Sequence, residues 1–104
     1  MAAQHFIAEQ GAQLAELCRR SHARALHLFG SGARDDFRAA DSDLDFLVEF
    51  EAMAPAAYSQ AFFALKEGLE QMFSRPVDLL TVDALRNPYL RQRVEAEQVL
   101  VYAA

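Results

Sequence analysis

The chain contains little cysteine, few basic residues and no long apolar run. Its one cysteine, Cys18, excludes an internal disulfide and a zinc site built from cysteine pairs. Ten Lys and Arg stand against fifteen Asp and Glu, and the net charge of −5 argues against direct nucleic-acid binding through bulk positive charge. No apolar segment is long enough to span a membrane, and the first residues do not resemble a signal peptide. We therefore expect a cytoplasmic protein that does not bind membranes.

The length and apolar content are those of one folded domain. Folded domains cluster at roughly 100–150 residues, and this chain has 104 residues, of which 53% are hydrophobic. That apolar content is too high for a disordered chain, so we expect residues 1–104 to form a single domain. Seven of the fifteen acidic residues lie between Asp35 and Glu51, which directs attention to that segment.

Apolar periodicity predicts alternating helices and strands. The expected fold class is α/β (α+β), a small mixed β-sheet with helices packed on one face. Pro55 is expected to begin a long amphipathic helix. The other expected elements are a helix over 6 to about 24, a strand over 25–29, one or two helical turns over 31–37, a strand over 44–50, a strand over 77–82, a helix over about 84–95 interrupted at Pro88, and an edge strand over 98–102.

The first candidate feature is Gly30-Ser31, which follows the expected strand 25–29. Glycine lets a backbone turn sharply and approach a ligand closely. The start of a helix offers free N–H groups that suit phosphate, and the Ser31 hydroxyl adds a donor. Gly-Ser is also common in ordinary turns, so the pair predicts a phosphate site only together with other features.

The second feature is the pair Asp43 and Asp45. Carboxylates two residues apart on a strand point the same way, roughly 6–7 Å apart at the backbone. Their repulsion is relieved by a cation, and Mg²⁺ and Mn²⁺ prefer such hard oxygen ligands. The alternative is a solvent-facing strand edge, although Asp is a poor strand former. The pair alone leaves both interpretations open.

The third feature is Asp78, an acid inside the apolar strand 77–82. Burying a carboxylate is costly unless it is paired or binds metal. If this strand lies beside 44–50, Asp78 joins the face that carries Asp43 and Asp45. Three carboxylates around two divalent ions are typical of phosphoryl and nucleotidyl transfer, with Asp78 placed to accept the attacking group's proton.

Taken in order, these motifs resemble the minimal nucleotidyltransferase family of the DNA polymerase beta-like superfamily. Three segments carry the resemblance: LFGSGAR (28–34), DSDLDFLV (41–48) and PVDLL (76–80). The resemblance implies a nucleotidyltransferase fold, with Asp43, Asp45 and Asp78 as catalytic ligands of Mg²⁺ or Mn²⁺. It also implies that Gly30 and Ser31 bind the nucleotide phosphates.

Arg34 follows the Gly-Ser turn and is a further candidate ligand of the nucleotide phosphates. The alternative is that Arg34 pairs with Asp36 or Asp41, and the sequence does not decide between these two roles.

The resemblance further implies an activity and a partner. Members of this family transfer AMP from ATP to an acceptor hydroxyl. Many resemble MntA-like antitoxins, whose partner is a helical HEPN-type ribonuclease toxin that is silenced by adenylylation of a tyrosine. We therefore expect a Mg²⁺-dependent protein adenylyltransferase that forms a hetero-oligomer with such a toxin.

Two departures from the family pattern keep other functions open. Gly32 stands where a larger residue is common, and Asp35 stands where glycine is common, so negative charge follows the phosphate turn and weakens triphosphate binding. The alternative is a non-catalytic binding module of the same fold that neutralises its partner by occlusion. A small-molecule modifier would need an additional substrate-binding domain.

The remaining charged and polar residues have ordinary interpretations. The three histidines lack metal-ligand spacing, and Lys66 and Glu70 are spaced for an exposed ion pair. The C-terminal arginines either face an acidic partner or lie on a solvated helix face; they are Arg86, Arg91 and Arg93.

Overall fold

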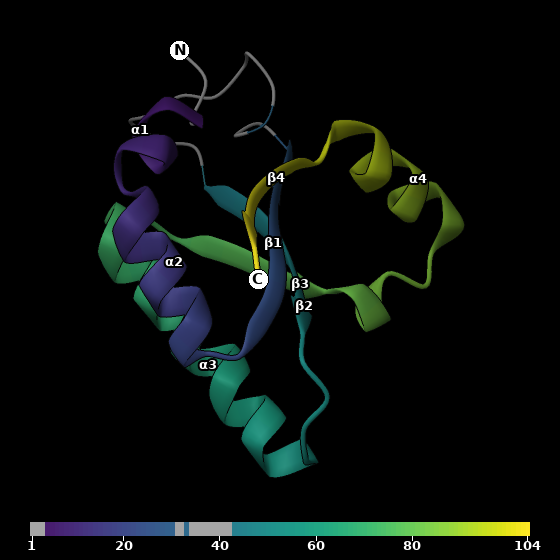
Figure 1. The fold of residues 1–104 in the computed structure, drawn as a ribbon. Helices are drawn as coiled ribbons and strands as arrows, with labels where there is room; N and C mark the ends of the chain where they lie inside the picture. Colours follow the sequence, from purple (N-terminus) through teal and green to yellow (C-terminus); the bar gives the residue numbers. More distant parts are fainter. Residues whose placement is uncertain (1–3, 31–32, 34–42) are drawn as a thin grey trace.

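The computed structural model describes residues 4–30, 33 and 43–104 (Figure 1). In chain order the elements are α1 (Gln4–Glu9), α2 (Gly11–Arg20), β1 (Ala23–Phe29), β2 (Leu44–Phe50), α3 (Pro55–Phe73), β3 (Val77–Thr81), a 3-10 turn (Val82–Ala84), α4 (Pro88–Glu97) and β4 (Val99–Ala103). Within these ranges, no helix has the length and apolar composition to cross a membrane.

The strands form a mixed four-stranded sheet in the order β3-β2-β1-β4. β1 is antiparallel to both β2 and β4, whereas β2 and β3 are parallel. A parallel pair needs a crossover connection, and the long helix α3 supplies it. The predicted α/β fold class with a mixed sheet is therefore confirmed, as is the edge position of the last strand.

One face of the sheet packs against α2 and α3 (Figure 1). Alternation along β2 turns Leu44, Phe46, Val48 and Phe50 to this face, where all four are buried. The amphipathic helix predicted from Pro55 covers them as α3, and its buried residues are Ala61, Leu65, Leu69 and Phe73. Cys18 of α2 is fully buried in the same core, and burial raises the pKa of its thiol to about 12.

The opposite face of the sheet is also covered, which corrects the prediction that helices pack on one face only. Phe29 and Leu47 lie on this face and form a second small core with residues from the α4 side, Leu85 and Val94. In Figure 1, α4 lies across the sheet from α1, α2 and α3. The physical reason is that β1 and β2 carry apolar side chains on both faces, and both must be removed from water.

The predicted helix over 6 to about 24 is wrong in its continuity and its end. The helix is interrupted at Gln10, whose φ of −105° and ψ of 23° separate α1 from α2. α2 ends at Arg20, and His22 takes a left-handed φ of 59° before β1 begins at Ala23. A left-handed residue just past a helix end stops the helix, so residues 23–24 belong to the strand.

Pro88 begins a helix rather than interrupting one, which corrects the predicted helix over about 84–95. Asn87 caps α4, since its side-chain oxygen accepts hydrogen bonds from the backbone N–H groups of Tyr89 (2.9 Å) and Leu90 (3.3 Å). Proline suits the first helical position because no partner is lost there. The segment before it forms the 3-10 turn Val82–Ala84.

Glu70 links the end of α3 to the start of β3. Its carboxylate accepts a hydrogen bond from the Val77 backbone N–H (3.2 Å) and one from Lys66 (3.4 Å). The predicted Lys66–Glu70 pair therefore forms, in a half-buried position. The Val77 N–H, followed by Lys66, lowers the pKa of the Glu70 carboxyl below its ordinary 4.5. Glu70 thus fixes the first residue of β3, one position before Asp78.

Truncation of a core residue on α3 should be far more destabilising than truncation of a larger exposed one. Leu65 is 0% exposed and Phe63 is 59% exposed. We expect Leu65→Ala to lower the free energy of unfolding by about 2–5 kcal/mol, because it removes buried methyl groups and leaves a cavity. Phe63→Ala should cost no more than about 1 kcal/mol. Urea unfolding followed by circular dichroism measures both, and equal losses would contradict the assigned face of α3.

Glu70 should contribute a pH-dependent part of the stability. Because its pKa is lowered in the folded state, its contribution is complete above the unfolded pKa and is lost as pH falls through the folded pKa. We expect Glu70→Gln to lower the melting temperature above about pH 5 and to approach the wild type below about pH 4. Thermal melts across this range test it, with Glu67→Gln on the same helix as the control. A difference that does not vary with pH would contradict it.

Candidate functional site

Gly30 directly follows β1 and lies against the side chain of Asp45. Its φ of +68° lies in the left-handed region, which side chains other than glycine rarely adopt. A Cβ built on Gly30 would overlap Oδ2 of Asp45 and lie 3.2 Å from its Cγ. Position 30 therefore favours glycine for two independent reasons, and the backbone at the end of β1 directly faces the Asp45 carboxylate.

Asp45 and Asp78 are direct neighbours across the parallel pair of β2 and β3. In-register residues of adjacent strands point to the same face, and adjacent strands lie about 4.8 Å apart. Asp45 is half-buried and Asp78 is exposed. The prediction that Asp78 joins the Asp45 face when the strands are adjacent is therefore confirmed.

The other predicted site residues differ in how far the structure describes them. Asp43 is exposed and lies one residue before β2, where the Leu44 backbone N–H donates to the Pro76 carbonyl (3.3 Å). Ser31 and Arg34 lie outside the described residues, and so do Gly32 and Asp35, the two departures from the family pattern. Of the predicted site residues, the structure thus describes Gly30 and the three carboxylates.

The carboxylates suit a divalent cation shared with a nucleotide. Within the described ranges, no three His, Cys, Asp or Glu side chains form a group that could hold a metal ion. Mg²⁺ usually takes one or two protein carboxylates and completes its shell with water and substrate phosphates. Asp45 and Asp78 supply two carboxylates from adjacent strands. The residues present therefore fit a cation that phosphate oxygens help to bind, rather than one enclosed by protein ligands alone.

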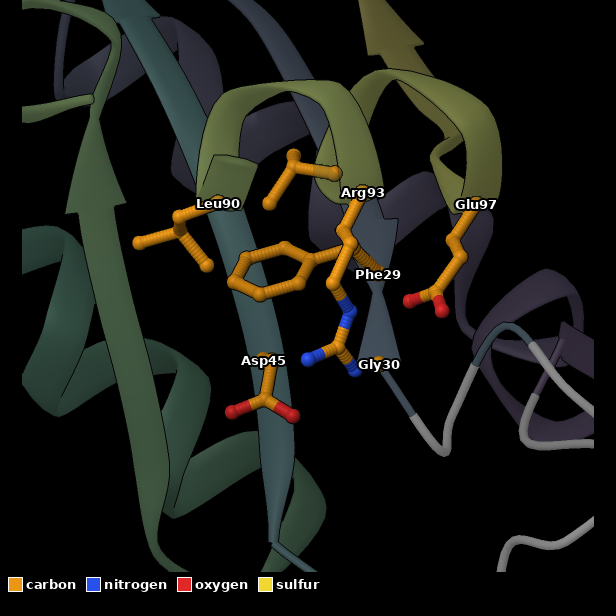
Figure 2. Close-up of a pocket in the computed structure, with 7 residues that line it drawn as sticks. Phe29, Gly30, Asp45, Leu90, Arg93 and Glu97 are labelled. Carbon is orange, nitrogen blue, oxygen red and sulfur yellow. The ribbon is translucent and has the colours of Figure 1, made fainter. Parts of the chain in front are cut away.

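A pocket of about 290 Å³ lies where α4 faces the ends of β1 and β2. Figure 2 shows the Arg93 side chain reaching from α4 toward Gly30 and Asp45, with Glu97 beside it. The pocket therefore combines an apolar wall with one guanidinium and two carboxylates. Its lining residues are Phe29, Gly30 and Asp45 from the sheet side and Leu90, Arg93, Val94 and Glu97 from α4.

Arg93 is the site residue that sequence reasoning left undecided. The sequence left an acidic partner or a solvated helix face open for it, and in the structure Arg93 is exposed and also lines the pocket beside Asp45. A usable pattern exists, because Leu90, Arg93, Val94 and Glu97 have the i, i+3, i+4, i+7 spacing of one helix face. Two apolar residues in that pattern indicate that the face is turned to the protein.

Comparison with known proteins gives relatives above 30% identity among both curated proteins and solved structures. The chain is 33% identical over 78 residues to the Methanocaldococcus jannaschii protein MJ1379, which is named as a predicted protein adenylyltransferase; the match covers 75% of this chain and 76% of the relative. A solved structure of a predicted minimal nucleotidyltransferase is 32% identical, covers 95% of both chains and has a TM-score of 0.65.

A more distant structure shares the fold. It comes from a complex of a tri-AMPylated Shewanella oneidensis HEPN toxin with an MNT antitoxin, and it is 18% identical with a TM-score of 0.62. The match covers 94% of this chain and 73% of that chain. These likenesses confirm the fold expected from the three sequence motifs.

The model of one protein family, described as the nucleotidyltransferase domain, matches residues 12–101. This range contains all three motifs and every described element from β1 to α4. The chain belongs to the nucleotidyltransferase domain family and is a nucleotidyltransferase.

Proposed function

We propose that this nucleotidyltransferase transfers AMP from ATP to a hydroxyl group of a partner protein, with Mg²⁺ or Mn²⁺ as its cofactor. The observation that carries the proposal is the meeting of Gly30, Asp45 and Asp78 on one face of the sheet. The Gly30 backbone lies against one carboxylate, and a second carboxylate is next to it in register. This combination suits a metal-bound triphosphate better than an uncharged ligand.

Each residue has a role in this reaction. Gly30, with Ser31 and Arg34, would bind the phosphates of ATP through backbone and side-chain donors. Asp45 and Asp78 would hold the divalent cation together with phosphate oxygens of the nucleotide, whereas Asp43, predicted as a third ligand, does not form a metal-binding group with them in the described arrangement. When bound, the cation supplies positive charge that offsets the phosphate charge and favours departure of pyrophosphate.

Asp78 is placed to serve the acceptor side of the reaction. It is exposed on β3, on the far side of Asp45 from Gly30 and β1. An acceptor hydroxyl that approaches from this side could give its proton to the Asp78 carboxylate as its oxygen attacks the α-phosphorus. The phosphates and the acceptor would then lie on opposite sides of Asp45.

The proposed acceptor is a tyrosine of a HEPN-type toxin, with which the chain would form a hetero-oligomer as an antitoxin. The fold neighbour in complex with an AMPylated HEPN toxin supports this choice, as does the relative named for protein adenylyltransferase activity. The competing proposal is a binding module of the same fold that neutralises its partner by occlusion. The acidic Asp35 after the phosphate turn favours that alternative.

Removal of the carboxylates should abolish AMP transfer. We expect Asp45→Asn and Asp78→Asn each to slow transfer at least about 100-fold, because a bound cation contributes several kcal/mol of charge stabilisation. The measurement is incorporation of labelled AMP, with ATP and Mg²⁺, into a HEPN-domain protein encoded beside this chain. Mass spectrometry then identifies the modified residue. Asp83→Asn, which alters an exposed acid in the 3-10 turn, should retain full activity.

The same experiment separates catalysis from occlusion. A wild type that never modifies the partner, while both variants still neutralise its toxicity, would contradict the proposed activity and favour occlusion. Transfer that survives both substitutions would contradict the assigned roles of the carboxylates.

Substitution of Gly30 should impair both stability and activity. We expect Gly30→Ala to lower the free energy of unfolding by about 1–2 kcal/mol, because alanine is strained at positive φ. Nucleotide affinity should also fall, since the added Cβ displaces the Asp45 carboxylate. Gly11→Ala is the matched control, as nothing lies within 4 Å of the Cβ position there. Thermal melts and ATP titrations measure both variants, and equal behaviour would contradict the proposed contact.

A further inference from the structure

Arg93 brings positive charge to the acidic end of the sheet from a separate helix. Its side chain extends from α4 toward Gly30 and Asp45 (Figure 2). We propose that Arg93 binds the β- and γ-phosphates of the nucleotide and thereby makes the protein prefer a triphosphate to a monophosphate. This inference rests on the proposed function, because it assigns one more residue to the same site.

The helix face of Arg93 is fixed by its neighbours. Val94 is buried against Phe29 and Leu47 in the second core, and this contact holds α4 with the 90–93–94–97 face toward the sheet. Arg91, on another face of α4, pairs with exposed Glu95 (3.0 Å). Both arginines are exposed, but packing of α4 places Arg93 at the pocket, whereas Arg91 is not among the lining residues.

The lining of the pocket places Arg93 on the donor side of the reaction. The lining includes Gly30 and Asp45 but neither Asp43 nor Asp78. Gly30 is the described residue proposed to bind phosphate, and Asp78 is on the opposite side of Asp45, toward the acceptor. A cation beside Gly30 is therefore positioned for phosphates rather than for the acceptor hydroxyl.

The charges of the lining residues favour a phosphate-binding role for Arg93. Asp45 and Glu97 carry two negative charges in a space that would also hold phosphate, and Arg93 carries the one positive charge among the lining residues. The two carboxylates attract the guanidinium of Arg93 electrostatically. Guanidinium presents paired N–H donors that match two phosphate oxygens, so it can contact the terminal phosphates in a bidentate manner.

The same contact serves the chemical step. The acceptor oxygen forms a bond to the α-phosphorus, and the bond from the α-phosphorus to the bridging oxygen of the β-phosphate breaks. That electron pair leaves with pyrophosphate, whose negative charge grows as the bond breaks. A guanidinium beside the β- and γ-phosphates would stabilise this charge.

The test compares ATP with AMP, which lacks the two phosphates that Arg93 would bind. Isothermal titration with Mg²⁺ present gives both affinities for the wild type, Arg93→Gln, Arg93→Lys and Arg91→Gln. We expect Arg93→Gln to weaken ATP binding about 10- to 100-fold, the usual range for a charge-assisted hydrogen bond, and to leave AMP binding unchanged. Arg93→Lys should recover part of the loss, because it keeps the charge but not the paired donors.

Arg91→Gln is the matched control, since it removes the same charge from the same helix outside the pocket. It should bind ATP as the wild type does. Equal weakening of ATP and AMP by Arg93→Gln would indicate a structural role and overturn the proposal. Unchanged ATP binding with a raised KM for the acceptor would overturn it in favour of an acceptor contact.

The failure of the proposed function would be distinguishable from the failure of this inference. A wild type that transfers no AMP but loses ATP affinity through Arg93→Gln would contradict the transferase proposal and support the phosphate contact. A wild type that transfers AMP while Arg93→Gln binds ATP normally would support the transferase proposal and contradict the phosphate contact of Arg93. A wild type that binds ATP no more tightly than AMP would overturn the Arg93 proposal outright.

Discussion

The candidate site depends on the register of β2 between its two neighbours. Asp45 is paired with Phe29 of β1 on one side and with Asp78 of β3 on the other. Side chains alternate along a strand. A shift of one residue in register would therefore turn Asp45 into the larger core under α2 and α3 and bring Phe46 to the site. Burial of the β2 side chains on that core therefore fixes the position of the carboxylates, and the hydrophobic effect determines where the charge lies.

The two faces of the sheet have different roles. The face toward α2 and α3 holds the larger core, and the face toward α4 combines a small core with the charged site. Leu47 and Asp45 are two residues apart on that second face, so an apolar anchor for α4 lies directly beside the acid. The anchor is what brings a basic residue of α4 to the nucleotide end of the sheet.

The sequence predicted the central elements well and the periphery less well. The strand at 44–50 and the helix from Pro55 follow from clear period-2 and period-3.6 patterns, and both match the structure. The motifs also predicted that Asp78 would join Asp45. The second layer was missed because Leu47 stands among acids and Leu85 lies in an irregular segment, so neither forms a periodic stripe. Arg93 could not be placed at the pocket from the sequence, because its position there depends on the packing of α4 on the second core.

The order of the strands has a consequence for α4. β3 and β4 are the opposite edges of the sheet, so the segment from Val82 to Gln98 must cross its whole width, about 14 Å for three strand spacings. The roof of the pocket is therefore a bridge anchored at both ends rather than a flap with one free side. Movement of α4 away from the sheet is limited by the pairing of β4 with β1 and of β3 with β2. An edge strand that contributes no residue to the lining thus holds one end of the segment that carries Arg93.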